Sequence, residues 1–294
     1  MRTLREVLES ASAKRAALGH FNFSEITVFK AVVQAAAELH LPVVLGVSES
    51  EREFLGLAEA AALVRSVRQE GQEIYLNADH THSLEKAEAA ARAGFDMIVF
   101  DASEKPLETN IAETRRAVEA VRSIRPEMLV EGEVGYVGSG SEIHEKRPDN
   151  IRLTDPAEAK DYIAATRVDL LSPSVGTTHG MLPSMIRGAE HKRLDIPRIA
   201  AIKNAVGLPL TLHGGSGTDD DDFRKAIQAG ITMIHINTEL RVAWRKALEE
   251  SLKKDATSVA PYKVLPTVVD AVKAVVLNRL RLFNALSVES ATNS

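Results

Sequence analysis

Residues Arg92-Ala-Gly-Phe-Asp-Met-Ile-Val-Phe-Asp-Ala-Ser103 contain the pattern on which the fold of the whole chain depends. A helical segment stops at Gly94, a short apolar run covers 97–100, and polar residues begin at Asp101. Glycine commonly follows the last residue of a helix, and a short, wholly apolar run is typical of a strand buried on both faces. Residues 228–239 repeat the pattern. The stretch therefore predicts a helix end followed by a buried parallel strand, a unit that the chain uses more than once.

Eight apolar runs of this kind alternate with longer segments of helical periodicity. The runs are 18–23, 42–47, 74–78, 97–100, 128–134, 168–172, 208–212 and 232–236. The helical segments include 25–39, 55–68, 84–93, 110–124, 156–166 and 221–229, with 240–254 and 266–284 after the last run. Eight strands that alternate with helices predict an α/β fold, the (β/α)8 TIM barrel. A doubly wound open sheet is the alternative, but no Gly-x-Gly-x-x-Gly follows the first run.

The chain shows no internal division. No linker or low-complexity stretch interrupts the 294 residues, so 1–294 is predicted to be a single domain. The last helical pattern exceeds what a barrel needs and predicts a C-terminal helical extension at about 262–286. This extension would either cap one end of the barrel or contact another subunit.

Composition narrows the class of function. A hydrophobic content of 45% supplies a core and excludes a disordered chain. The formal charge of -5, without a basic stripe, gives no reason to expect nucleic acid or a membrane as partner, so a small molecule is expected. The absence of cysteine excludes disulfides and thiolate metal sites. No signal-peptide pattern begins the chain and no apolar run approaches the ~18 residues that span a bilayer, so a cytoplasmic location is expected.

Three histidines follow three different apolar runs. His80 closes Ile74-Tyr-Leu-Asn-Ala-Asp-His80, His179 lies in Gly-Thr-Thr-His179-Gly, and His213 precedes Gly-Gly-Ser-Gly. Strand ends in a TIM barrel converge on one face, where three imidazoles can hold a catalytic zinc ion with one position left open. Four further histidines are expected to be structural: His20, His40, His144 and His191.

Further polar residues occupy the same strand-end positions. They include Asn22, Ser48, Asp79, Asp101, Glu131, Glu133, Asn237 and Thr238. Asp79 would cap a helix, orient an imidazole, or act as a general base beside the metal. The glycines of 213–217 allow main-chain N–H groups to approach a phosphate, although a plain turn is the alternative. Residues 132–142 are interpreted as a mobile loop that would close over substrate or as an ordinary surface loop, and the acidic run 219–222 as a helix cap.

Six blocks of the chain, taken in order, resemble the class II, zinc-dependent ketose-bisphosphate aldolases, which include the fructose- and tagatose-1,6-bisphosphate enzymes. The resemblance extends over about 19–284, nearly the whole chain. The blocks are Asp79-His80, Phe100-Asp-Ala-Ser103, Glu131-Gly-Glu-Val-Gly135, Gly176-Thr-Thr-His-Gly180, His213-Gly-Gly-Ser-Gly217 and Asn237-Thr-Glu239.

The resemblance implies a role for each matching residue. His80, His179 and His213 would hold the catalytic Zn2+, and Asp79 would exchange a proton with the C4 hydroxyl of the sugar. Two carboxylates, Asp101 and Glu133, match positions that can hold a second divalent cation. Substrate-binding positions would be Gly180, Gly214, Ser216 and Thr238 at one phosphate, beside a monovalent cation (Na+ or K+), and Asn22 and Ser48 at the other phosphate end.

The chain departs from the family pattern at three places. His235 replaces the usual Asn; it and Asn237 share a strand face, so His235 would point into the barrel as a substrate contact, a base near the metal or a packed replacement. Ser141 falls where the mobile-loop glutamate is expected, which makes the adjacent Glu142 the candidate second catalytic residue. Met181 and Leu182 replace the aromatic residue that usually follows His-Gly.

The resemblance thus implies an enzyme, a lyase that reversibly cleaves a ketose 1,6-bisphosphate, foremost fructose 1,6-bisphosphate, into dihydroxyacetone phosphate and glyceraldehyde 3-phosphate. The alternatives are an aldolase for tagatose bisphosphate or another phosphorylated ketose, a catalytically weak barrel that binds sugar phosphates, and a metallohydrolase. Relatives are usually dimers or tetramers, so a homo-oligomer is expected. Arg279 and Arg281 would then either reach a neighbour's phosphate site or lie on a solvated helix face.

Overall fold

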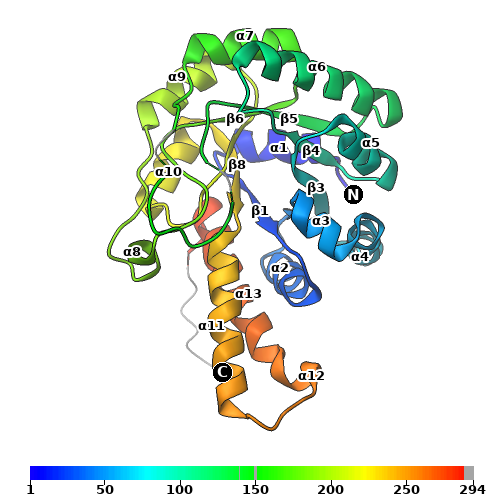
Figure 1. The fold of residues 1–294 in the computed structure, drawn as a ribbon, viewed down its shortest axis with the longest axis vertical. Coiled ribbons are helices and arrows are strands. Elements are labelled where there is room, and N and C mark those ends of the chain that lie inside the picture. The colour runs from blue at the N-terminus through cyan, green and yellow to red at the C-terminus, as the bar shows by residue number, and fades with distance from the viewer. Residues whose placement is uncertain (139, 149–150, 288–294) are drawn as a thin grey trace.

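The computed structural model describes residues 1–138, 140–148 and 151–287. Its centre is a closed barrel of eight parallel strands in sequence order, with β8 paired to β1 (Figure 1). The strands are β1 (Leu18–Asn22), β2 (Val43–Val47), β3 (Ile74–Thr81), β4 (Met97–Phe100), β5 (Leu129–Val134), β6 (Leu170–Pro173), β7 (Leu210–Leu212) and β8 (Ile231–Ile236). Each predicted apolar run overlaps one strand, so the TIM-barrel prediction is confirmed.

Helices surround the barrel because each has an apolar face that packs on the strands. They are α2 (Ile26–Leu39), α4 (Leu57–Gln69), α5 (Leu84–Ala93), α6 (Leu107–Ile124), α7 (Pro156–Thr166), α9 (Ile196–Val206), α10 (Asp220–Ala229), α11 (Thr238–Lys254) and α13 (Pro266–Phe283). Short helices α3 (Glu49–Leu55), α8 (Pro183–Ile186) and α12 (Pro261–Val264) lie in connections. Helices α3, α8 and α9 add to those that the periodicity predicts. In the part of the chain that the structure describes, none of the helices combines the length and apolar character needed to cross a membrane.

The amino ends of the strands are closed by α1 (Leu4–Ala13), another helix that the periodicity does not predict. Three of its side chains pack against a residue from each of seven strands. We call this group the floor cluster; it consists of Leu4, Val7, Leu8, Leu18, Val44, Tyr75, Met97, Leu129, Leu170 and Met233. All of these side chains are nearly fully buried. Apolar side chains therefore fill this end of the barrel.

The C-terminal helix α13 belongs to the layer of helices that surrounds the barrel. It packs against α2, α11 and β1, and its buried residues Val268, Val272, Val276 and Leu280 recur every four positions. The additional helix was expected to cap a barrel end or contact a neighbour; α13 covers the outside of β1, and the contact with a neighbour stays a prediction. Figure 1 shows α11 and α12 extending away from the barrel before α13 returns to it.

Candidate active site

The carboxyl ends of the strands surround a cavity of about 610 Å³, at the end opposite the floor cluster. Its wall includes Ser48, Asp79, His80, Asp101, Glu142, His179 and Asn237. A narrower recess of about 20 Å³ shares Asp79, His80 and His179 with this cavity. The recess also contains Asn22, Gly180, His213, Gly214, Ser216, His235 and Thr238. Every predicted site residue except Glu133 thus lines one of two adjoining spaces.

A bulge in β3 brings Asp79 and His80 into the site together. Strict alternation would send two consecutive side chains to opposite faces of the strand. The β3–β4 register shifts between Ala78 and Thr81, and His80 has a φ of 41°, in the left-handed region that a histidine rarely occupies. The extra residue turns both side chains toward the cavity. Such strain is typical of functional positions.

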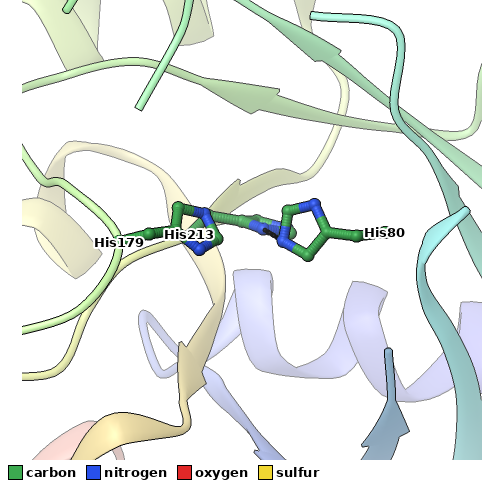
Figure 2. Close-up of side chains that lie close together, drawn as sticks. All are labelled: His80, His179 and His213. Carbon is green, nitrogen blue, oxygen red and sulfur yellow. Dashed lines mark hydrogen bonds between the residues drawn. The ribbon is translucent and has the colours of Figure 1, made fainter. Parts of the chain in front are cut away.

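The imidazoles of His80, His179 and His213 point toward one another (Figure 2). His80 Nε2 lies 3.0 Å from Nδ1 of His213. One ligand nitrogen from each of the three rings lies within 4.8 Å of the other two. The three strand-end histidines that the sequence singles out therefore form one cluster.

Two carboxylates accept hydrogen bonds from the ring nitrogens of His80 and His213 that do not face the other imidazoles. His80 Nδ1 donates to Asp101 Oδ2 at 2.8 Å, and His213 Nε2 donates to Glu131 Oε1 at 2.8 Å. In the neutral rings these bonds leave lone pairs on the two nitrogens that face each other. Thr211 also donates to Glu131, at 2.6 Å. Glu131 was not assigned a role in the site from the sequence. It lies two residues before Glu133, so strand alternation puts both carboxylates on the inner face of the strand.

The protonation tendencies of the cluster follow from burial and these contacts. Burial and the charges of His80 and His213 hold the pKa of His179 well below its usual value, which keeps that ring neutral. Burial disfavours a charged His80, but Asp79 and Asp101 outweigh it and raise the pKa of His80 to about 10. Burial and the charge of Asp101 raise the pKa of Glu133 to about 8.

The cluster fits a divalent metal. Nε2 of His179 is buried without a hydrogen-bond partner among the described residues, a costly state for a polar atom. A metal ion would satisfy it together with the two inward nitrogens of His80 and His213. Three imidazoles, two of them oriented by carboxylates, suit zinc.

Asp79 lies beside the cluster as an ionised carboxylate. Its Oδ2 accepts a 2.9 Å hydrogen bond from Asn22, which also donates to Glu51 at 3.0 Å. Its Oδ1 lies 3.4 Å from Nδ1 of His235. Burial alone would raise the pKa of Asp79, but the charge of His80 and the contact with His235 hold it well below the usual range. The buried Glu51 is a site component that we did not predict from sequence.

His235 is stacked between two other imidazoles. Its ring centroid lies 3.6 Å from that of His20 and 3.9 Å from that of His213. Burial and these neighbours hold the pKa of His235 well below its usual value. His20, expected to be structural, is completely buried beside Asn77, so it supports His235 from below the recess. His235 does point into the barrel, as strand alternation predicted.

Asp101 and Glu133, the residues proposed to hold a second cation, lie next to Nδ1 of His80. Glu133 Oε2 is 3.8 Å from His80 Nδ1, the same nitrogen that donates to Asp101. The three residues have ligand atoms within 4.8 Å of one another. Asp101 also accepts from the main-chain N–H and hydroxyl of Ser103. In this arrangement Asp101 orients His80, and the second cation stays a prediction.

The candidate phosphate loops follow β6 and β7. Gly180 and Gly214 have φ values of 71° and 63°, and a Cβ on Gly214 would lie 2.6 Å from the carbonyl oxygen of Thr178. Glycine is therefore required where the two loops approach. Ser216 Oγ accepts from the N–H groups of Asn237 and Glu239, which joins the β7 loop to the start of α11. Asp219 caps α10 as expected, by accepting from two N–H groups of the first turn.

At these loops the main-chain carbonyls expected beside a monovalent cation already have a hydrogen-bond donor. The carbonyl oxygens of Gly180, Gly214 and Ser216, three of the residues expected beside Na+ or K+, all accept hydrogen bonds from the buried ammonium group of Lys192. The donor that these three carbonyls share is therefore a side chain of the protein itself.

Loop 135–155, of which 139 and 149–150 lie outside the described residues, carries Glu142 to the mouth of the cavity. The carbonyl of Glu142 accepts from Met181 N–H at 2.9 Å, and Arg241 donates to the carbonyl of Ser141 at 3.0 Å. The Glu142 side chain is exposed. Ser48 precedes α3 on the opposite wall, where its N–H donates to Glu51.

The two arginines of α13 are paired within the chain. Arg279 donates to Glu239 at 2.7 Å and to Asp220 at 2.5 Å, and Arg281 lies 3.6 Å from Glu38. These contacts tie α13 to α10, α11 and α2.

The fold and the site define a barrel enzyme whose active site can hold a divalent metal. The chain belongs to the class II fructose-bisphosphate aldolases, whose family model matches residues 2–287. It is therefore a member of a family of lyases. It is 31% identical over 287 residues to the fructose-bisphosphate aldolase of Geobacillus stearothermophilus, an alignment covering 96% of each chain. Identity is also 31% with the fructose-bisphosphate aldolase of Thermus caldophilus, covering 96% of this chain and 97% of that protein. The solved structure of the YdjI aldolase from Escherichia coli K12 matches with a TM-score of 0.80 at 26% identity, over 95% of this chain and 96% of that one.

Proposed function

We propose that this enzyme reversibly cleaves fructose 1,6-bisphosphate into dihydroxyacetone phosphate and glyceraldehyde 3-phosphate. The observation that carries the proposal is the buried, ionised Asp79 beside the three-imidazole cluster. Cleavage of the bond between C3 and C4 needs a base for the C4 hydroxyl proton and stabilisation of the charge that develops toward the C2 ketone. Asp79 would supply the base, and a metal held by the three imidazoles of the same recess would supply the stabilisation.

Each group has a defined task in this proposal. Zinc held by His80, His179 and His213 would supply Lewis-acid stabilisation of the developing negative charge. Asp79 would take the C4 hydroxyl proton during cleavage and return it during condensation. Asn22, which donates to Asp79 Oδ2, keeps the carboxylate aimed at the recess. Glu142, at the cavity mouth, is the proposed partner for proton exchange at C3.

Substrate phosphates would bind at the two sides of the cavity. Gly180, Gly214, Ser216 and Thr238 line the recess on the side of β6 to β8, where main-chain N–H groups and the Ser216 hydroxyl suit an oxyanion. Asn237 lines both spaces and would contact the sugar between them. Asn22 in the recess and Ser48 on the cavity wall would contact the other phosphate-bearing end of the substrate.

A direct assay tests the proposal. Purified protein loaded with zinc is mixed with fructose 1,6-bisphosphate, and triose phosphate release is followed before and after a chelator is added. We expect release that stops with the chelator and returns when zinc is restored. Absence of chelator-sensitive release would reject the proposal. Phosphate release without carbon–carbon cleavage would instead indicate a metallohydrolase, and substrate binding without proton exchange a catalytically weak sugar-phosphate-binding barrel.

Tagatose 1,6-bisphosphate, or another phosphorylated ketose, is the alternative substrate. The observation that favours this alternative is the position of His235. Its Nε2 is buried without a partner among the described residues, in the recess beside Asp79. The fructose and tagatose esters differ in configuration at C4, the carbon whose hydroxyl Asp79 would serve. His235→Asn is therefore expected to change the ratio of kcat/KM for the two esters by about tenfold, a typical effect of one hydrogen bond to substrate.

His40→Asn is the matched control for this substitution, because His40 follows α2, far from the cavity residues. An unchanged ratio in His235→Asn would show that His235 does not read the sugar.

The proposal extends to assembly and location. We propose a homo-oligomer, a dimer or tetramer, because Leu252, Val259 and Tyr262 are exposed on the projecting α11–α12 region. A cytoplasmic location suits a chain without cysteine that acts on phosphorylated sugars.

A further inference from the structure

Lys192 has an unusual place for a lysine. It lies between α8 and α9, is 3% exposed, and inserts its ammonium group between the loops that follow β6 and β7. Nζ donates to the carbonyl oxygens of Thr178 and Gly180 from the first loop, both at 2.6 Å. It also donates to the carbonyl oxygens of Gly214 at 2.9 Å and Ser216 at 2.6 Å, from the second loop. One side chain therefore holds four main-chain carbonyls from the two candidate phosphate loops.

This arrangement favours a charged nitrogen. Convergent main-chain carbonyl oxygens are the ligands with which proteins bind hard monovalent and divalent cations. An ammonium group has three protons to donate, whereas a neutral amine would turn a lone pair toward a carbonyl oxygen. Burial opposes the charge and lowers the pKa of Lys192 to about 7, with Glu239 acting in favour of the charge and Arg147 against it. The four carbonyl oxygens offset this burial cost because they accept the three ammonium protons, one of which two carbonyls must share.

The direction of the four carbonyls has a consequence for the recess. In a trans peptide the carbonyl and the following N–H point in opposite directions, and all described peptide bonds are trans. When Gly214 turns its carbonyl to Lys192, the N–H of Gly215 points away from Lys192; Gly214, Gly215 and Ser216 all line the recess. The main chain of Lys192 adds a bond to Gly217 O at 2.9 Å. The lysine thus determines how the second loop presents its amide groups.

We propose that Lys192 is the built-in cation of the phosphate-binding loops, so that this enzyme binds the substrate phosphate without Na+ or K+. Lys192 is a positioning residue: it acts through the loops whose carbonyls it holds. The inference rests on the phosphate position of the proposed function, but not on the aldol reaction itself.

The experiment measures binding of inorganic phosphate by calorimetry, and thermal melting, in matched KCl, NaCl and tetramethylammonium chloride. Tetramethylammonium is too large for the carbonyl cage. For the unmodified zinc-loaded enzyme, we expect the same Kd within about twofold, and the same Tm, in all three salts. Dependence of either quantity on K+ or Na+ would overturn the proposal, because a separate cation would then be required.

Two substitutions separate charge from volume. Lys192→Ala opens the cage, and we expect phosphate affinity about tenfold weaker in tetramethylammonium, with recovery of affinity and Tm in KCl or ammonium chloride. Lys192→Met fills the space without charge, so its affinity should fall in every salt without recovery. Phosphate affinity equal to that of the unmodified enzyme in Lys192→Met would overturn the proposal.

Lys203→Ala is the control, since Lys203 donates to a single carbonyl, that of Leu208, before β7 begins; its phosphate affinity should not change. If neither Lys192 variant folds, the salt series on the unmodified enzyme still decides. Absence of aldol cleavage together with salt-independent phosphate binding would reject the proposed function and leave this inference standing. Salt-dependent phosphate binding together with normal cleavage would overturn this inference and leave the proposed function standing.

Discussion

At the scale of single residues, the site depends on one irregularity in β3. The bulge with its left-handed His80 places a base and a metal-ligand candidate side by side, which a regular strand cannot do. The surrounding hydrogen bonds hold this strained backbone: Arg52 donates to the carbonyl of Asp79 and to Thr81 Oγ1. Asp79 and His80 therefore act as a unit whose geometry is set by the backbone.

Asp79→Asn tests the base. Asparagine keeps the shape and the bond to Asn22 but cannot accept the C4 hydroxyl proton, so kcat should fall by about 10²- to 10⁴-fold. Zinc content, measured by mass spectrometry, should stay the same because Asp79 is outside the three-imidazole cluster. Asp270→Asn, at an exposed position of α13, is the matched control and should retain full activity. Turnover of Asp79→Asn at the control level would remove Asp79 from its proposed role.

The identity of the residues at the strand ends predicted much of the site. The site residues that it did not predict were missed for physical reasons. The three histidines, Asp79 and Asp101 follow apolar runs, and the barrel brings such positions together. The roles of His20 and Glu131 depend on which neighbour each side chain meets across the barrel, and no local pattern encodes that. Lys192 lies in an irregular segment where a lysine normally indicates solvent, so its burial could not be predicted.

At the scale of elements, strands and long helices were predictable because their periodicity reflects burial. Helix α5 (Leu84–Ala93) and helix α7 (Pro156–Thr166) begin and end as predicted, since Gly94 and Asp155 are clear end signals. Helix α1 was not predicted, because its few apolar positions are separated by charged residues. It forms because Leu4, Val7 and Leu8 find the open amino end of the barrel. Its stability is thus tertiary in origin.

Leu8→Ala tests the importance of α1. Leu8 is 2% exposed within the floor cluster, and the cavity left by its truncation should lower the free energy of unfolding by about 2–5 kcal/mol. Denaturant unfolding at 25 °C measures the change, and kcat should be unaffected because the floor lies opposite the site. Glu9→Ala, on the exposed face of the same helix, is expected to change the free energy by less than about 0.5 kcal/mol. Equal stability of the two variants would show that α1 does not close the barrel.

At the scale of the whole molecule, the barrel divides its interior between two ends. The floor cluster is apolar, whereas the opposite end concentrates Asp79, Asp101, Glu131 and Glu133 among buried imidazoles. Composition predicted a chain with ample core and a small-molecule partner, and it excluded thiolate metal sites because the chain has no cysteine. It could not predict how the C-terminal helices lie, since a hydrophobic face alone does not specify which neighbour it covers.

Metal binding should therefore be visible in global stability. The three imidazoles and their carboxylates come together only in the folded chain, so zinc at 100 times its Kd stabilises the fold by about 2.7 kcal/mol. We expect removal of zinc by a chelator to lower Tm by about 5 °C or more, with recovery when zinc is restored. A His179→Ala variant should melt at the same temperature with and without zinc. Equal Tm values for the zinc-loaded and metal-free unmodified enzyme would argue against the site.

The position of α1 has a practical consequence for anyone who wishes to immobilise this catalyst. Met1 lies beside the floor, at the end of the barrel that substrate does not use. A bead or electrode attached through the N-terminus would therefore leave the mouth of the barrel facing the bulk solution, and sugar phosphates would reach it unhindered.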